Sequence, residues 1–286
     1  MKKTELWRSA LSPSYMTWKC KQEAGGTNDN ITETFAKDTK IRLLTLCFMM
    51  GRPELSFKQF KGLLHFVGVV SLSDDVIDKA NMTGFSNRDT FKDFLMNQEI
   101  QIVGQSTSIQ HLLSLTHDQF VNDKKEIIDP FLDYMITLHW QGAGKGKPGE
   151  YGVQDVLEYR DKTNIPLGVA ALGLLDIPKQ DIDETINRMK PTGDAIQLFD
   201  DRIDWRQDLG SNTLNAFIGI SNDSCEVSRL TEVYNQGAKS DRGIYSQGLE
   251  KTRKGYRALM DNRFQNMENS LFKSSLMLAG KLLVRK

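Results

Sequence analysis

Apolar residues recur along most of the chain with the three- and four-residue spacing of one helix face. This spacing predicts helices over residues 31–50, 57–78, 89–96, 111–120, 127–140, 155–175, 182–190, 193–209 and 248–286. Alternating apolar and polar runs are few, so the pattern leaves little room for a sheet. The Gly-rich segment 141–150 predicts a connector, and Pro166 predicts a kink in its helix. We therefore expect an all-α protein.

Length and composition narrow the class of protein. The 286 residues are 39% hydrophobic, which is enough for one large core. We expect a single domain over residues 1–286, with roughly the first 30 residues loosely ordered. The formal net charge of zero argues against a nucleic-acid-binding protein, whose binding surface would be basic.

The cysteines and the apolar runs indicate in which cellular compartment the protein is expected. The three cysteines have no metal-like spacing and favour a reduced compartment. The first residues, Met1–Trp7, lack the apolar centre of a signal peptide. The longest apolar run, Ile165–Leu175, is too short to span a bilayer. We expect a cytoplasmic protein without stable membrane insertion.

Two acidic clusters share the pattern Asp-Asp-x-x-Asp. The first is formed by Asp74, Asp75 and Asp78, and the second by Asp200, Asp201 and Asp204. Aspartates four residues apart lie on one helix face, about one turn apart. Carboxylates that close repel each other unless a cation lies between them. Mg²⁺ is the natural candidate, because it commonly joins one or two carboxylates to phosphate oxygens.

The second cluster belongs to a longer polar stripe with residue spacings of 3, 4, 3 and 4. The stripe consists of Asp194, Gln197, Asp201, Asp204 and Asp208. Its helix carries Ile196, Phe199 and Ile203 on other faces. A polar stripe on such a helix faces either solvent or a lined cavity. Two clusters that each follow an apolar helix favour metal sites; the alternative is a pair of solvated acidic helix ends.

The segment Gly193–Asp204 resembles the second aspartate-rich signature of trans-isoprenyl diphosphate synthases, GxxFQxxDDxxD, with Ile196 in place of Phe. The pair Lys162-Thr163 resembles the Lys-Thr pair with which that family contacts diphosphate, and Leu72–Asp78 resembles its first signature. These matches run from about residue 60 to about residue 215. The resemblance implies the class I isoprenoid synthase fold, a single large helical bundle around a central apolar cavity.

The resemblance also implies an enzyme that ionises a prenyl diphosphate with about three Mg²⁺ ions. The implied metal ligands are Asp74, Asp75, Asp78, Asp200, Asp201, Asp204 and Asp208, with Asp74, Asp75, Asp201 and Lys162 in catalytic roles. The implied substrate contacts are Arg160, Lys162, Thr163, Gln197, Phe66 and Phe199. The two phenylalanines would stabilise an allylic carbocation in a dry interior, although packing in the core is the alternative for both. A homodimer is an expectation at the level of the family.

The chain departs from the chain-elongating members of that family. These carry Arg-Arg-Gly soon after the first signature, whereas Lys79–Phe85 has no arginine pair. The segment Lys37–Arg42 is a poor match for their N-terminal Gly-Lys-Arg, and Asn212 lies near the position of a later Lys. The missing cations would bind a second diphosphate. The sequence therefore favours a one-substrate terpene synthase that forms a hydrocarbon or alcohol and releases diphosphate.

Two alternatives stay open. One is a prenyltransferase, which either elongates prenyl chains head to tail or couples them head to head as squalene and phytoene synthases do. The other is a non-enzymatic helical protein whose acidic clusters bind a metal ion or a basic partner.

Overall fold

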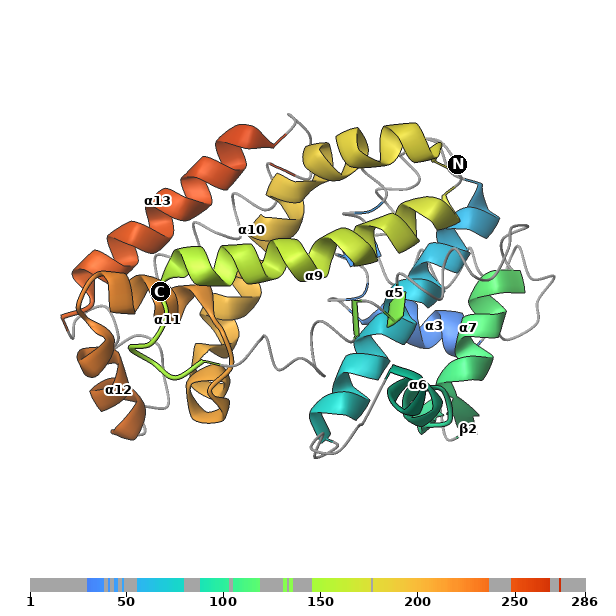
Figure 1. Ribbon diagram of the computed structural model, residues 1–286, viewed down its shortest axis with the longest axis horizontal. Helices are drawn as coiled ribbons and strands as arrows, with labels where there is room; N and C mark the ends of the chain where they lie inside the picture. The colour runs from blue at the N-terminus through green and yellow to red at the C-terminus, as the bar shows by residue number, and fades with distance from the viewer. Residues whose placement is uncertain are drawn as a thin grey trace. The chain divides into compact units, whose positions relative to one another are not determined.

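A computed structural model describes residues 30–38, 41, 44–45, 48, 56–79, 88–102, 105–118, 131–132, 134–135, 146–175, 177–236, 248–267 and 273. These residues are mostly helical, which confirms the all-α prediction (Figure 1). The helices are α3 (Asn30–Lys37), α5 (Phe57–Lys79), α6 (Arg88–Met96), α7 (Ile109–Asp118), α9 (Val153–Leu174), α10 (Lys179–Ser211), α11 (Ala216–Asp223), α12 (Val227–Asn235) and α13 (Glu250–Asn266). The loosely ordered N-terminal segment predicted above lies outside the described residues, as do parts of the predicted helix over 31–50, most of the one over 127–140 and the end of the one over 248–286.

One short hairpin interrupts the helices. Strands β1 (Glu99–Ile102) and β2 (Gln105–Ser108) pair antiparallel. The sequence analysis did not predict them. Each strand is only four residues long, so the alternation is too brief to stand out from helical spacing.

The chain divides into two compact units. Unit 1 comprises residues 1–141 and 164–186, and unit 2 comprises residues 142–163 and 187–286. The helices α9 and α10 each contribute residues to both units. The expectation of one domain over the whole chain stays a prediction.

Unit 1 is built on α5, which packs against α7 and α3. The helix begins with a reciprocal cap: Gln59 N donates to Ser56 Oγ over 3.1 Å, and Ser56 N donates to Gln59 Oε1 over 3.0 Å. Its buried face carries the apolar residues expected from the spacing, Phe60, Leu63, Leu64, Val67 and Val70.

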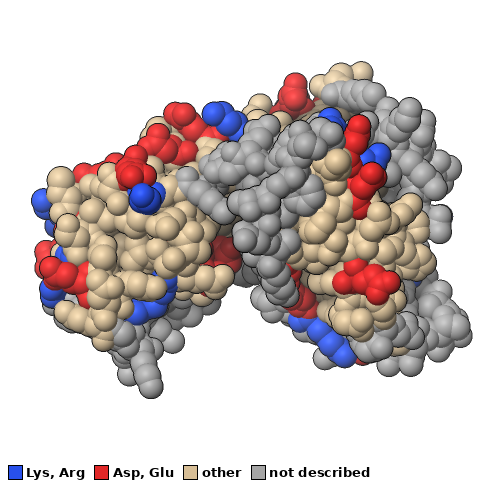
Figure 2. All heavy atoms as spheres, turned by 60° about the horizontal axis from the view of Figure 1, so that its bottom comes forward, with Lys and Arg blue, Asp and Glu red and all other residues tan. Residues whose placement is uncertain are grey.

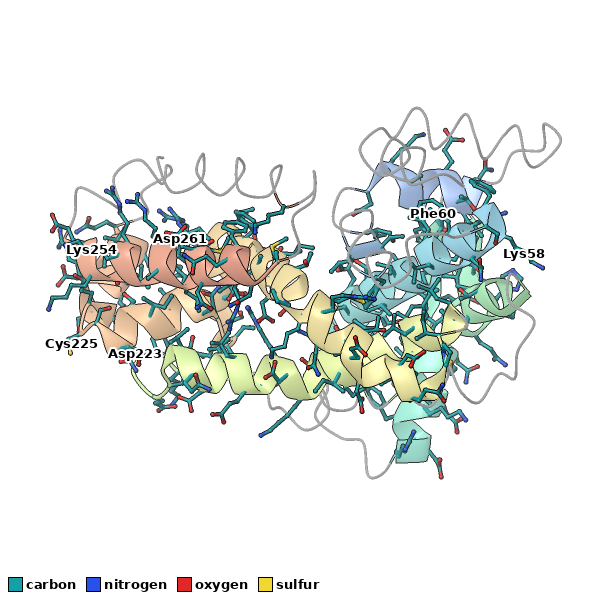
Figure 3. The ribbon with its side chains drawn as sticks, turned by 90° about the horizontal axis from the view of Figure 1, so that it is seen from above. Lys58, Phe60, Asp223, Cys225, Lys254 and Asp261 are labelled. Carbon is teal, nitrogen blue, oxygen red and sulfur yellow. The ribbon has the colours of Figure 1, made fainter. Side chains whose placement is uncertain are left out.

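Unit 2 joins α11 to α12 and α13. The carboxylate of Glu226 accepts hydrogen bonds from Lys251 N over 3.1 Å and Thr252 N over 2.8 Å, which caps the first turn of α13. One face of α13 buries Tyr256, Met260 and Phe264. The other carries exposed residues such as Lys254 and Asp261 (Figure 3).

Two prolines lie inside continuous helices. The sequence predicted separate helices over 182–190 and 193–209, but α10 runs unbroken for 33 residues through Pro191. A proline removes one backbone donor, and this helix keeps its other turns because buried residues flank the site, including Met189 and Thr192. Helix α9 likewise continues through Pro166.

Replacing either of two helical glycines with alanine should change stability in opposite directions. A methyl group at Gly219 would lie 2.8 Å from Val153 N and 2.9 Å from Gly152 C, which are backbone atoms that cannot turn aside. At Gly173 it would meet no described atom within 4 Å. We expect Gly219→Ala to lower the free energy of unfolding by about 1–3 kcal/mol and Gly173→Ala to raise it by about 0.5–1 kcal/mol. Denaturant titration of both variants checks this; equal effects would contradict it.

On the described part of the face in Figure 2, acidic and basic side chains are interspersed. No helix among the described residues is long and apolar enough to cross a membrane.

Candidate functional site

The second acidic cluster lies on α10 in unit 2, and part of its stripe faces the interior. Asp194 and Asp201 are buried, with 4% and 6% of their surface exposed. Asp204 and Asp208 are half-buried, whereas Ile203 is 58% exposed. A solvated acidic helix end would expose its carboxylates and bury its isoleucine. The alternative of solvated acidic helix ends therefore does not describe this side of α10.

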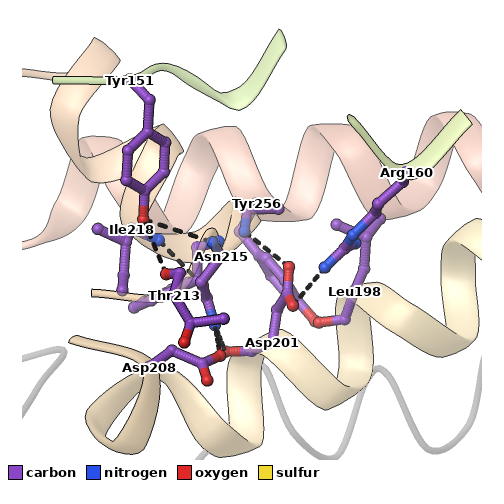
Figure 4. A network of polar contacts seen from close by, with 11 residues as sticks. Tyr151, Arg160, Leu198, Asp201, Asp208, Thr213, Asn215, Ile218 and Tyr256 are labelled. Carbon is purple, nitrogen blue, oxygen red and sulfur yellow. Dashed lines mark hydrogen bonds and ion pairs between the residues drawn. The ribbon is translucent and has the colours of Figure 1, made fainter. Parts of the chain in front are cut away.

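Asp201 is held at both carboxylate oxygens (Figure 4). Arg160 Nη2 donates to Asp201 Oδ1, and Ala216 N donates to Asp201 Oδ2 over 2.6 Å. Burial raises the pKa of Asp201, and the charge of Arg160 and the Ala216 hydrogen bond oppose that rise. Asp201 thus satisfies a backbone donor in the first turn of α11 and fixes α9 to α10. Its role as a metal ligand stays a prediction.

Asn215 lies at the centre of the same network and was not singled out from the sequence. Its Oδ1 accepts from Phe217 N over 2.8 Å and Ile218 N over 3.2 Å, as the cap of α11. Its Nδ2 donates to the backbone oxygen of Asp201 over 2.8 Å and to Asp208 Oδ2 over 2.7 Å. The signal in the sequence was an asparagine directly before the apolar run of residues 216–220.

Asp208 closes the acidic stripe. Burial raises its pKa to about 6, with further increases from the charges of Asp201, Asp204 and Asp200, while the Asn215 hydrogen bond opposes the rise. The neighbouring aspartates thus act on Asp208 as like charges. Such a group favours any bound positive charge, whether a proton or a metal cation.

The raised pKa predicts how stability depends on pH. The folded protein binds the Asp208 proton more tightly than the unfolded chain, so the free energy of unfolding should fall as pH rises from about 4 to about 6. The Asp208→Asn variant should show a shallower fall over this interval. Denaturant titration in the presence of a chelator measures both slopes. Parallel slopes in the two proteins would contradict the assignment.

Cations accompany the stripe in unit 2. Arg263 Nε lies 2.9 Å from Asp194 Oδ2, and Lys190 forms an ion pair with Asp161. Burial raises the pKa of Asp194, and the charges of Arg263, Lys190 and Arg160 oppose this. The Nη1 atom of Arg160 is buried and has no hydrogen-bond partner among the described residues. The aspartates of the stripe therefore have positively charged side chains as well as other carboxylates near them.

The predicted substrate contacts on α9 differ in exposure. Lys162 is exposed, Arg160 is buried against Asp201, and the buried Thr163 Oγ1 donates to the backbone oxygen of Arg160 over 3.1 Å. Gln197 on α10 is half-buried. All four belong to unit 2 with the second cluster. Among them, Lys162 is the side chain that is open to an incoming anion.

The first cluster lies at the end of α5 in unit 1, as the sequence predicted. Asp74 is half-buried and Asp75 is exposed, while the side chain of Asp78 lies outside the described residues.

Both aromatic candidates are packed. The ring centroids of Phe66 and Phe131 are 6.3 Å apart in unit 1, and those of Phe199 and Phe264 are 6.4 Å apart in unit 2. These contacts are those expected of core residues, which was the alternative for both phenylalanines.

The donor set of α10 suits a hard cation. Asp200, Asp204 and Asp208 are half-buried carboxylates four residues apart, so they form a row along one side of the helix. Within the described ranges, no group of three or more His, Cys, Asp or Glu side chains is gathered closely enough to enclose a metal ion. An open site with one or two carboxylates fits Mg²⁺, which takes its other ligands from water and phosphate.

Comparisons with known proteins found no match. No family model matches the chain, and no curated protein or solved structure is significantly similar to it. The resemblance to isoprenoid synthases therefore rests on the motif residues themselves.

Proposed function

We propose that the protein is a Mg²⁺-dependent class I terpene synthase with the isoprenoid synthase fold, which ionises a linear prenyl diphosphate. The observation that carries the proposal is the acidic row of Asp200, Asp204 and Asp208. It lies in a segment that resembles the family's most specific signature. Burial raises the pKa of its last member, Asp208, and the neighbouring carboxylates raise it further.

The acidic row of α10 would hold Mg²⁺, and Asp74, Asp75 and Asp78 of α5 would hold a further Mg²⁺ ion. Bound there, Mg²⁺ would take up negative charge that develops on the leaving diphosphate. The donor set supports this role, because all of these ligands are carboxylate oxygens, which magnesium prefers to nitrogen or sulfur.

The chain's own cations would complete diphosphate binding. The exposed Lys162 would donate to phosphate oxygens, while the buried Arg160 keeps Asp201 and α9 in register with α10. The difference in exposure supports these separate roles. The amino group of Lys162 is in contact with solvent and can reach a bound diphosphate, whereas the guanidinium of Arg160 is buried and paired with Asp201.

The test is incubation of the purified protein with Mg²⁺ and geranyl, farnesyl or geranylgeranyl diphosphate, with and without isopentenyl diphosphate, followed by mass analysis. A product with the carbon number of its substrate, formed without isopentenyl diphosphate, is the expected result. A longer diphosphate would indicate chain elongation, and a doubled carbon skeleton would indicate head-to-head coupling. Absence of turnover with all three substrates would overturn the proposal.

A further inference from the structure

Asn215 makes more hydrogen bonds than a helix cap requires. A cap needs one acceptor for the amides of the first turn, and serine or aspartate supplies it about as well. Asn215 provides that acceptor to Phe217 N and Ile218 N. It is fully buried, with 0% of its surface exposed, and its amide nitrogen forms two further bonds.

Those two bonds are directed at α10. One goes to the backbone oxygen of Asp201 over 2.8 Å, and the other to Asp208 Oδ2 over 2.7 Å. An aspartate at position 215 would have no donor and a serine only one, so only the amide side chain makes the cap and both contacts together. The second contact is between side chains and fixes the rotamer of Asp208.

The carboxylate of Asp208 needs such a restraint. Asp204 lies one turn before it on α10, and like charges at that spacing drive side chains apart. Asn215 holds Oδ2 toward the start of α11. Within the part of the chain that the structure describes, Asp208 Oδ1 accepts no hydrogen bond, so that oxygen remains available to a cation.

We infer that Asn215 is a positioning residue, which presents Asp208 Oδ1 to a divalent cation bound at the acidic row of α10. The inference rests on the proposed function, since that function supplies the metal. It adds a residue outside the aspartate-rich signatures to the metal site. Outer partners that orient metal ligands typically change metal affinity by about 10- to 100-fold when they are removed.

The experiment measures Mn²⁺, a paramagnetic substitute for Mg²⁺, by electron paramagnetic resonance of the free ion in titrations of the full chain. The variant Asn215→Ser keeps the cap acceptor and adds no charge, but it cannot make both contacts to α10. The matched control is Asn222→Ser, because Asn222 Nδ2 donates to the backbone oxygen of Tyr151 over 2.7 Å in the same unit. Circular dichroism and thermal unfolding confirm that each variant is folded.

We expect Asn215→Ser to weaken Mn²⁺ binding by about 10- to 100-fold, and Asn222→Ser to leave it unchanged. Unchanged Mn²⁺ affinity in a folded Asn215→Ser protein would overturn the inference and leave the proposed function standing, with Asn215 a helix cap only. Equal weakening in the Asn222 control would overturn it as well. A parent protein that binds no Mn²⁺ would show that the metal site of the proposed function fails, and the inference with it.

Discussion

Replacing Asp204 with Asn should lower the rate of diphosphate release by about a hundredfold or more and leave the protein folded. Asp204 is half-buried in the middle of the acidic row, one turn from both Asp200 and Asp208. Loss of a direct metal ligand should cost at least as much as loss of an outer partner, which is typically about 10- to 100-fold. Substrate turnover at saturating Mg²⁺, together with thermal unfolding, measures the two effects separately.

The control for this prediction is Asp261→Asn. Asp261 is exposed on α13, so the same chemical change there should alter neither turnover nor stability (Figure 3). An Asp204→Asn protein that turns over substrate at the parental rate would remove the acidic row from the mechanism.

Replacing Arg160 with Met should destabilise the protein by about 3–5 kcal/mol, because it leaves the Asp201 carboxylate buried without its cation. The guanidinium is the largest influence that lowers the pKa of Asp201, so the variant should bind a proton at that carboxylate more readily. A group with a raised folded-state pKa stabilises the folded protein at low pH. The variant should therefore regain stability on acidification. Denaturant titration over a range of pH measures both effects.

Arg229→Met is the matched control, because Arg229 pairs with Glu232 on the surface. Exposed pairs contribute at most about 1 kcal/mol. Equal losses in the two variants, or an Arg160→Met loss that grows on acidification, would contradict a stabilising role for the buried pair.

Local patterns predicted the helices because each helix carries its own signals. The apolar set of α5 from Phe60 to Val70 is buried as its spacing required, and the reciprocal cap of Ser56 and Gln59 marks its beginning. The prediction of two helices over 182–190 and 193–209 was wrong, since α10 continues through Pro191 and buried neighbours can outweigh one lost backbone hydrogen bond.

The roles within the second cluster depended on contacts that spacing does not contain. Asp200 and Asp201 are adjacent in the sequence and indistinguishable by motif, yet Asp201 is buried between Arg160 and the start of α11 while Asp200 is half-buried. Those partners lie 41 and 15 residues away in the chain. Asn215 escaped notice for the same reason, because its cap signal is local but its bonds to α10 are made only in the folded protein.

The central claim is that the acidic row of α10 holds Mg²⁺ against a diphosphate. Calorimetric titration of inorganic diphosphate into the purified protein tests it most directly, with Mg²⁺ present or removed by a chelator, and with the Asp204→Asn variant alongside. The account predicts heat of binding only when Mg²⁺ is present and a large loss of affinity in the variant. Equal binding with and without Mg²⁺, or no binding in its presence, would contradict it.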